Sequence, residues 1–280
     1  MSHSNTAARV ARSANTIARW CGVRDVSALS RDSLRREACV AEGVADLFVL
    51  FGGGVIGSVE MLADAMRAGV ARRYAIVGGR GRATYWLDQA VAKELGVPES
   101  AASGVVPGAS SEAEMLDALL YQRHGLRADL LETASTNCGN NITYLLDLLE
   151  GEGNVPATVI LCQDAVMQRR MDVTWQRQVQ DRAAFSRVRV INWAAYEAEL
   201  VATDRALSWA HAPEGIWPID TYLQLLAGEV ARLTDDEHGY GPCGRDYVVH
   251  IDVPSGIAEA ACELVRLTDL VGRPPDERYA

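Results

Sequence analysis

The chain has 280 residues and a formal net charge of -10, with 49% hydrophobic and 23% charged residues. This length and composition are typical of a globular protein with a sizeable core, and they exclude global disorder. The acidic balance argues against a non-specific nucleic-acid-binding protein, because such proteins carry a basic surface.

Neither a metal site nor a membrane segment is expected. The six cysteines are scattered without a C-x-x-C pair, which argues against a zinc site and against a disulfide framework. Residues 1–19 are polar and lack the apolar run of a signal peptide. The longest apolar stretch, at 47–57, is too short and too rich in glycine to cross a bilayer. The sequence therefore predicts a cytoplasmic protein.

Two helices are predicted first, at 5–21 and 32–42, and an alternation of strands and helices follows. Apolar runs that end in glycine or polar residues are typical of parallel strands buried on both faces. Such runs predict strands at 45–51, 73–77, 128–133, 158–163 and 187–193. The helices predicted among them cover 58–68, 84–95, a segment opened by Ser111, 141–150 and 167–179.

The alternation ends after about Ala195, where we expect a helix from Thr221, a strand at 247–253 that buries His250, and a helix at 258–268. Repeated strand–helix units favour right-handed crossovers and a parallel sheet with helices on both faces. The predicted fold is a doubly wound, mostly parallel, Rossmann-like α/β core. The core covers 45–195, between a helical segment at 1–44 and a smaller α+β extension at 196–280 packed on it.

Two glycine clusters end neighbouring strands of the predicted sheet. Gly52-Gly53-Gly54-Val55-Ile56-Gly57 has the G-x-G-x-x-G form between a strand and a helix, which is typical of a dinucleotide-binding turn. The acidic residue expected about twenty residues later is absent, since Gly78-Gly79-Arg80-Gly81 stands there. The clusters are either the floor of a ligand site, with Arg80 facing an anion, or tight turns with a solvated arginine.

Polar side chains crowd the ends of the third and fourth predicted strands. One side chain is enough to cap the helix after the third strand, so the surplus there predicts hydrogen bonds to a ligand. After the fourth strand, Asp164 can cap the next helix while Gln163 points over the crevice. Arg169 and Arg170 lie in that helix's first turns, where positive charge is unfavourable unless a carboxylate or anion is near.

These strand ends are where open α/β sheets bind ligands. The predicted cofactor-binding residues are Gly52, Gly53, Gly54, Gly78, Gly79, Arg80, Gly81, Ser135, Thr136, Asn137, Asn141, Gln163, Asp164, Arg169 and Arg170.

Three segments resemble the YdcF-like family of Rossmann-like proteins. They are Ser135-Thr136-Asn137-Cys138-Gly139, then Gln163-Asp164 with Met167-Gln168-Arg169-Arg170, and the stretch from Trp217-Pro218 to Gly244-Arg245-Asp246. The resemblance covers nearly the whole chain. It implies a nucleotide-type ligand, with S-adenosylmethionine the one associated with the family, and no established reaction.

The chain departs from the family pattern at two places. Asn140 stands where the family has Glu, and Ala165-Val166 replaces Pro-Thr. If Asn137 is the N-cap, Asn140 is the third helical position, where Glu would complete a capping box. The first departure therefore changes either capping alone or the identity of the ligand.

Three functions remain open, each with a small molecule as the partner and with the oligomeric state not predicted. The first is an enzyme, such as a transferase, or a sensor that binds an adenosine-containing molecule, with S-adenosylmethionine as the cofactor. Methyl transfer depends mainly on proximity and alignment, so it requires no catalytic triad. The second is hydrolysis or group transfer on a phosphorylated or sugar-linked substrate, with Glu112, Glu132 or Asp164 as acid or base. The third is a regulatory protein that binds its ligand without turnover.

The glycine-rich loop at 239–244 has two readings. It anchors the C-terminal extension, with Arg245 and Asp246 paired locally, or it folds over the crevice as a lid that carries Tyr240 and Arg245. Trp217 is expected in the core.

Overall fold

A five-stranded parallel sheet forms the centre of the computed structural model, which describes residues 3–82, 84–96, 108–203 and 206–268. The strand order is β3-β2-β1-β4-β5. The direction of winding reverses at β1, so the topological switch point lies between β1 and β4. The strands are β1 (Ala45–Phe51), β2 (Ala71–Val77), β3 (Leu130–Glu132), β4 (Thr158–Gln163) and β5 (Arg189–Ala194).

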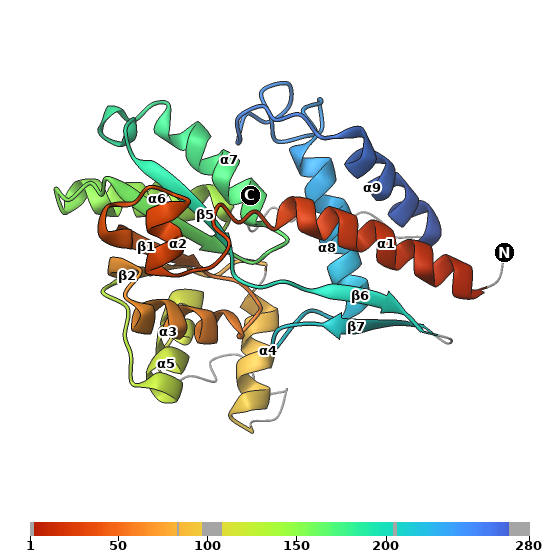
Figure 1. Cartoon of the computed structure of the whole chain (residues 1–280), viewed down its shortest axis with the longest axis horizontal. Coiled ribbons are helices and arrows are strands. Elements are labelled where there is room, and N and C mark those ends of the chain that lie inside the picture. Colours follow the sequence, from red (N-terminus) through yellow and green to blue (C-terminus); the bar gives the residue numbers. More distant parts are fainter. Residues whose placement is uncertain (1–2, 83, 97–107, 204–205, 269–280) are drawn as a thin grey trace.

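Helices cover both faces of this sheet (Figure 1). Phe48 and Leu50 of β1 belong to the same apolar cluster as residues of two helices on one face, α3 (Ser58–Ala68) and α5 (Glu112–His124). Leu47 and Val49 point to the other face, toward α6 (Cys138–Gly151) and α7 (Gln168–Val179). Side chains alternate along a strand, so a strand buried on both faces is apolar throughout. The chain has the predicted doubly wound α/β fold.

Caps explain where several helices begin. The Ser111 hydroxyl accepts a hydrogen bond from the Glu114 N–H, and the Glu114 carboxylate accepts one from the Ser111 N–H. This is the expected capping box, and α5 begins there. Asn137 caps α6, since its Oδ1 accepts from Asn140 N at 2.9 Å, and this helix starts at Cys138 rather than at 141. The predicted helix at 32–42 is instead α2 (Arg31–Arg36) and a short 3-10 helix (Ala41–Gly43). The helix α4 (Thr84–Glu94) lies where it was expected.

The first helix and the C-terminal elements form a second group beside the sheet (Figure 1). Helix α1 (His3–Cys21) runs along α9 (Ser255–Thr268), and Glu263 of α9 accepts hydrogen bonds from Arg9 and Ser13. A hairpin of β6 (Glu199–Ala202) and β7 (Leu207–His211) packs on α1. Helix α8 (Ile219–Leu233) contacts both α1 and α9, so the two ends of the described chain share one core.

The predicted strand at 247–253 is wrong. The segment pairs with no strand among the described residues, and it packs on α7, where Val249 N donates to Val173 O at 3.2 Å. Val248 is buried against Val173 and Leu233. The prediction of a buried His250 is also wrong: its side chain is 58% exposed and pairs with Asp235 at 2.6 Å. Apolar composition here reflects packing on a helix, which composition alone does not separate from a sheet.

The loop at 239–244 anchors the extension, as one of its two readings proposed, although the local pair of Arg245 with Asp246 is wrong. Asp246 instead pairs with Arg177 of α7 at 2.8 Å, and Tyr240 N donates to Arg232 O of α8 at 2.8 Å.

None of the described helices is long and apolar enough to cross a membrane.

A buried ion pair joins the extension to the core, and it generates a first prediction. Arg170 of α7 donates to Glu229 of α8 at 2.6 and 2.9 Å, and the Glu229 side chain is 1% exposed. Arg170→Met leaves a buried carboxylate whose remaining ion-pair partner among the described residues is Arg232. We expect the free energy of unfolding in urea to fall by about 3 kcal/mol.

The double variant Arg170→Met, Glu229→Met removes both charges and is expected to recover most of that loss. A double variant no more stable than Arg170→Met alone would contradict this account.

Candidate functional site

The ends of four strands meet at one edge of the sheet, as the sequence predicts. Gly52 N donates to Val77 O at 2.7 Å, and Gly78 N donates to Glu132 O at 2.9 Å. Gln163 reaches across from β4, where its Nε2 donates to Gly52 O at 3.2 Å. The glycine clusters and the polar residues after β3 and β4 therefore lie along a single rim, which we call the carboxyl rim.

Glu112 lies at the centre of this rim. Its backbone N donates to Gly79 O at 2.8 Å, which places the first residue of α5 beside the end of β2. The side chain fills the space that the absent side chain of Gly52 leaves, since a Cβ on Gly52 would overlap Glu112 Oε2, and the Glu112 Cβ lies 3.3 Å from where a Cβ on Gly78 would be. The Thr84 hydroxyl donates to Glu112 Oε1 at 2.5 Å. Gly52 leaves room for the carboxylate, and Gly78 lets the turns after β1 and β2 approach each other closely.

Burial raises the pKa of Glu112 to about 7. The Glu112 side chain is 6% exposed, and desolvation favours its neutral form. The hydrogen bond from Thr84 and the positive charge of Arg80 oppose that shift only in part. A carboxyl group with this pKa can take up and release a proton near neutral pH, which is the property required of a general acid or base.

The turns after β2 and β3 touch through their backbones. A Cβ on Gly79 would overlap Ser135 O, and one on Gly81 would lie 2.9 Å from Thr136 O. Gly79 N donates to the Ser135 hydroxyl at 3.0 Å. Both glycines therefore serve the close approach of two loops, and Ser135 is buried in that contact.

Arg80 is held at the edge of the rim by a carboxylate. Its Nη2 donates to Asp88 Oδ2 at 2.7 Å, and its side chain remains 44% exposed. Asp88 is buried, and its Oδ1 has no hydrogen-bond partner in the part of the chain that the structure describes. The positive charge of Arg80 is thus largely balanced by the protein itself.

Glu132, the last residue of β3, also has a free acceptor atom. Its Oε1 accepts from Ala134 N at 2.6 Å and Ser135 N at 3.0 Å. Its Oε2 is buried and has no hydrogen-bond partner among the described residues. Thr133 and Ala134 are exposed, and Thr136 is partly exposed. The β2–β3 part of the carboxyl rim, which we call the open half, therefore reaches solvent.

The β1–β4 part is closed by the protein's own side chains. Trp217 from the extension is buried as predicted, and a Cβ on Gly54 would overlap its ring. Trp217 Nε1 donates to Asp164 Oδ2 at 3.1 Å, and the Tyr196 hydroxyl donates to Asp164 Oδ1 at 2.5 Å. Burial raises the pKa of Asp164. The first glycine cluster is covered, so a phosphate could lie on it only if Trp217 moved.

Other predicted site residues after β4 have structural partners. Asp164 Oδ1 accepts from Val166 N and closes a turn before α7, so it does not cap this helix, and Gln163 is buried rather than pointing over a crevice. Arg169 turns away from the rim, donates to Trp20 O at 2.7 Å and lies over the Trp20 ring. Arg170 meets Glu229, so the unfavourable position at the helix start is balanced by a carboxylate of the protein.

Of the predicted site residues after β3, some are held by contacts within the protein and one stays partly exposed. Asn137 uses its Oδ1 to cap α6, and Asn141 is buried one turn later. Thr136 carries the oxygen that approaches Gly81 and keeps a partly exposed side chain. Sequence reasoning missed Thr84, Asp88 and Tyr196. Tyr196 is the second residue after β5, so its place near a strand's carboxyl end was the signal available for it.

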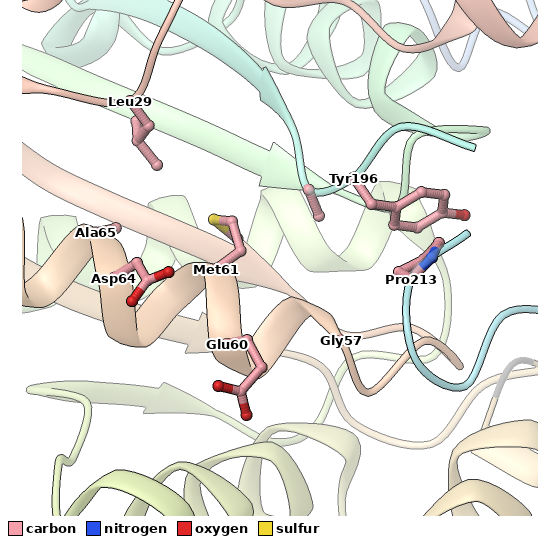
Figure 2. A pocket seen from close by; sticks show the side chains of 9 residues that line it. Leu29, Gly57, Glu60, Met61, Asp64, Ala65, Tyr196 and Pro213 are labelled. Carbon is pink, nitrogen blue, oxygen red and sulfur yellow. The ribbon is translucent and has the colours of Figure 1, made fainter. Parts of the chain in front are cut away.

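A shallow pocket of about 350 Å³ lies next to the closed β1–β4 part of the carboxyl rim, between α3 and the segment after β5. Figure 2 shows Tyr196 and Pro213 on one side of it, and Met61 and Asp64 of α3 on the other. None of the predicted site residues lines it. The Tyr196 hydroxyl connects this pocket to Asp164 at the end of β4.

No protein-family model matches the chain. Membership of the YdcF-like family therefore stays a prediction. Among the described residues, no group of three or more histidine, cysteine, aspartate or glutamate side chains is placed to hold a metal ion.

Titration of Glu112 gives a second prediction. Its pKa rises from 4.5 to about 7 on burial, so between these values the folded chain binds the proton more tightly than the unfolded chain. The free energy of unfolding must then fall as the pH rises through this window, by up to about 3 kcal/mol. In Glu112→Gln this contribution is absent. We therefore expect the free energy of unfolding of the wild type minus that of the variant, measured in urea, to decrease by that amount as the pH rises from 4 to 8.

Glu114 on the same turn is the matched control. Hydrogen bonds from Ser110 and Ser111 lower the pKa of Glu114, so its contribution is present above pH 4.5 and is lost as the pH falls. Glu114→Gln should therefore change the profile only at the acid end. A difference profile for Glu112→Gln that stays flat between pH 4.5 and 7 would show that Glu112 has an ordinary pKa.

Proposed function

We propose that this protein binds an adenosine-containing small molecule at the open half of the carboxyl rim, with S-adenosylmethionine as the first candidate. One observation carries the proposal: Asp88 Oδ1 and Glu132 Oε2 are buried carboxylate oxygens without a hydrogen-bond partner among the described residues. A buried acceptor without a donor costs free energy. A ligand that brings donors or a positive charge removes this cost.

The charges of the open half favour a cation over a phosphate. Glu112, Glu132 and Asp88 supply three buried carboxyl groups, and the neighbouring guanidinium of Arg80 is already paired with Asp88. The first glycine cluster, where a dinucleotide would place its diphosphate, lies under Trp217. S-adenosylmethionine carries a sulfonium cation, an amino group and ribose hydroxyls, all of which suit acidic acceptors. The resemblance to the YdcF-like family supports the same ligand.

The residues that would hold this ligand are those of the open half, with Glu132 as its acceptor and the turns at 79–81 and 133–136 around it. S-adenosylmethionine supplies an electrophilic methyl group when bound. The chain's contribution to such a transfer is to hold the two reactants in place and to exclude water, which requires no nucleophile of its own.

A second function is favoured by Glu112. A buried carboxyl group with a pKa of about 7 suits a general acid or base in hydrolysis or group transfer on a phosphorylated or sugar-linked substrate. In that case Glu112→Gln abolishes turnover, whereas a regulatory protein would bind its ligand without any turnover.

A ligand panel tests the proposal and forms the third prediction. The purified chain is titrated by calorimetry and by thermal shift with S-adenosylmethionine, S-adenosylhomocysteine, oxidised and reduced nicotinamide dinucleotides, and a nucleotide sugar. We expect both S-adenosyl compounds to bind. At a hundred times the Kd, a ligand adds about 2.7 kcal/mol to the free energy of unfolding and raises Tm accordingly.

The dinucleotides are expected to leave Tm unchanged, because Trp217 covers the glycine cluster they would need. Asp117→Asn is a suitable control variant, since Asp117 is a buried carboxylate that accepts from Ala128 N before β3 begins, away from the rim. Binding of the phosphorylated compounds alone would favour the second function. Absence of heat and of thermal shift with both S-adenosyl compounds would overturn the proposal.

A further inference from the structure

We infer that Glu132 receives the ribose hydroxyls of the adenosine ligand, in place of the acidic residue that is missing from the end of β2. The inference rests on the proposed function and assigns one part of the ligand to one side chain. It draws on three features of Glu132: its register against β2, its orphaned oxygen atom and its position in the open half.

The register places Glu132 beside the position of the missing acid. In the dinucleotide fingerprint, an acidic residue at the end of the second strand holds a ribose hydroxyl. Here that strand, β2, ends at Val77 and Gly78 follows it. Val77 pairs with Glu132 of the adjacent parallel strand β3. Neighbouring strands lie about 4.8 Å apart. The carboxylate is therefore displaced by one strand from the position where the fingerprint expects it.

The carboxylate is held in place with one oxygen left over. Two backbone N–H groups, of Ala134 and Ser135, fix Oε1, whereas Oε2 meets no donor and Glu132 makes no ion pair among the described residues. A neutral hydroxyl supplies a donor without adding a charge. Two neighbouring hydroxyls on a ribose offer two such donors to one carboxylate.

The surroundings give the ligand a side from which to approach. Thr133 and Ala134, which directly follow Glu132, are exposed, and the neighbouring Ser135 packs on Gly79 at the end of β2. Glu132 Oε2 itself is shielded from solvent. Contact with a hydroxyl therefore requires a rotation of the carboxylate or a shift of the exposed turn at 133–134.

The test compares ligands that differ only in their ribose, and it is the fourth prediction. Wild type and Glu132→Gln are titrated by calorimetry with S-adenosylhomocysteine and with its 2′-deoxy and 3′-deoxy analogues. Loss of a hydroxyl that donates to a carboxylate should weaken wild-type binding by about 10-fold or more for at least one analogue. In Glu132→Gln the same loss should cost less than about 3-fold, because an amide is a weaker acceptor than a carboxylate.

Glutamine keeps an oxygen for Ala134 and Ser135, so the turn is expected to fold, and the Tm of the variant checks this. Asp117→Asn is the matched control and should keep the wild-type discrimination between ribose and deoxyribose. The wild-type titration is informative by itself: equal affinity for S-adenosylhomocysteine and both analogues would overturn the inference and leave the proposed function standing.

Two further results would also decide the matter. Discrimination that persists unchanged in a folded Glu132→Gln would assign the hydroxyls to another residue and overturn the inference alone. Failure of wild type to bind S-adenosylhomocysteine or S-adenosylmethionine would overturn the proposed function and the inference together.

Discussion

The close contact between the turns that follow β1, β2 and β3 organises the whole carboxyl rim. A side chain at Gly52 would meet the Glu112 carboxylate, one at Gly79 would meet the backbone of Ser135, and Gly78 packs closely on the backbone of Gly52. This contact brings a carboxyl group into a dry environment and raises its pKa. The glycines therefore leave room for other parts of the protein itself. Their spacing, by contrast, predicts a turn that binds a phosphate.

The core of the fold was predictable because its strands are buried on both faces. β1, α3 and β4 match their predicted bounds residue for residue. For the two strands, a continuous apolar run ended by glycine or by polar residues is typical of a parallel strand buried on both faces. The extension was less predictable. β6 and β7 are short, and the segment at 247–253 is apolar because it packs on α7. The apolar composition of this segment indicates that it is buried, but it does not indicate which element it packs against.

The site was predictable in position and less so in detail. Strand ends in a doubly wound sheet converge, and the predicted residues at Gly52, Gly78, Glu132 and Gln163 do lie along one rim. Which half stays open depends on Trp217, which is distant from Gly54 in the sequence and packs on it only in the folded chain. Arg169 and Arg170 are placed by Trp20 and Glu229, which are also distant from them in the sequence. Short-range patterns carry no information on such partners.

The pairing of the first helix with the last has a consequence for how the protein forms in the cell. Ala14 and Ile17 of α1 are fully buried in a core shared with Leu264 of α9, and Glu263 of α9 bonds to α1. A ribosome releases α1 before α9. Until α9 is released, the buried apolar side chains of α1 that pack on it stay exposed on the nascent polypeptide, the kind of surface on which chaperones act.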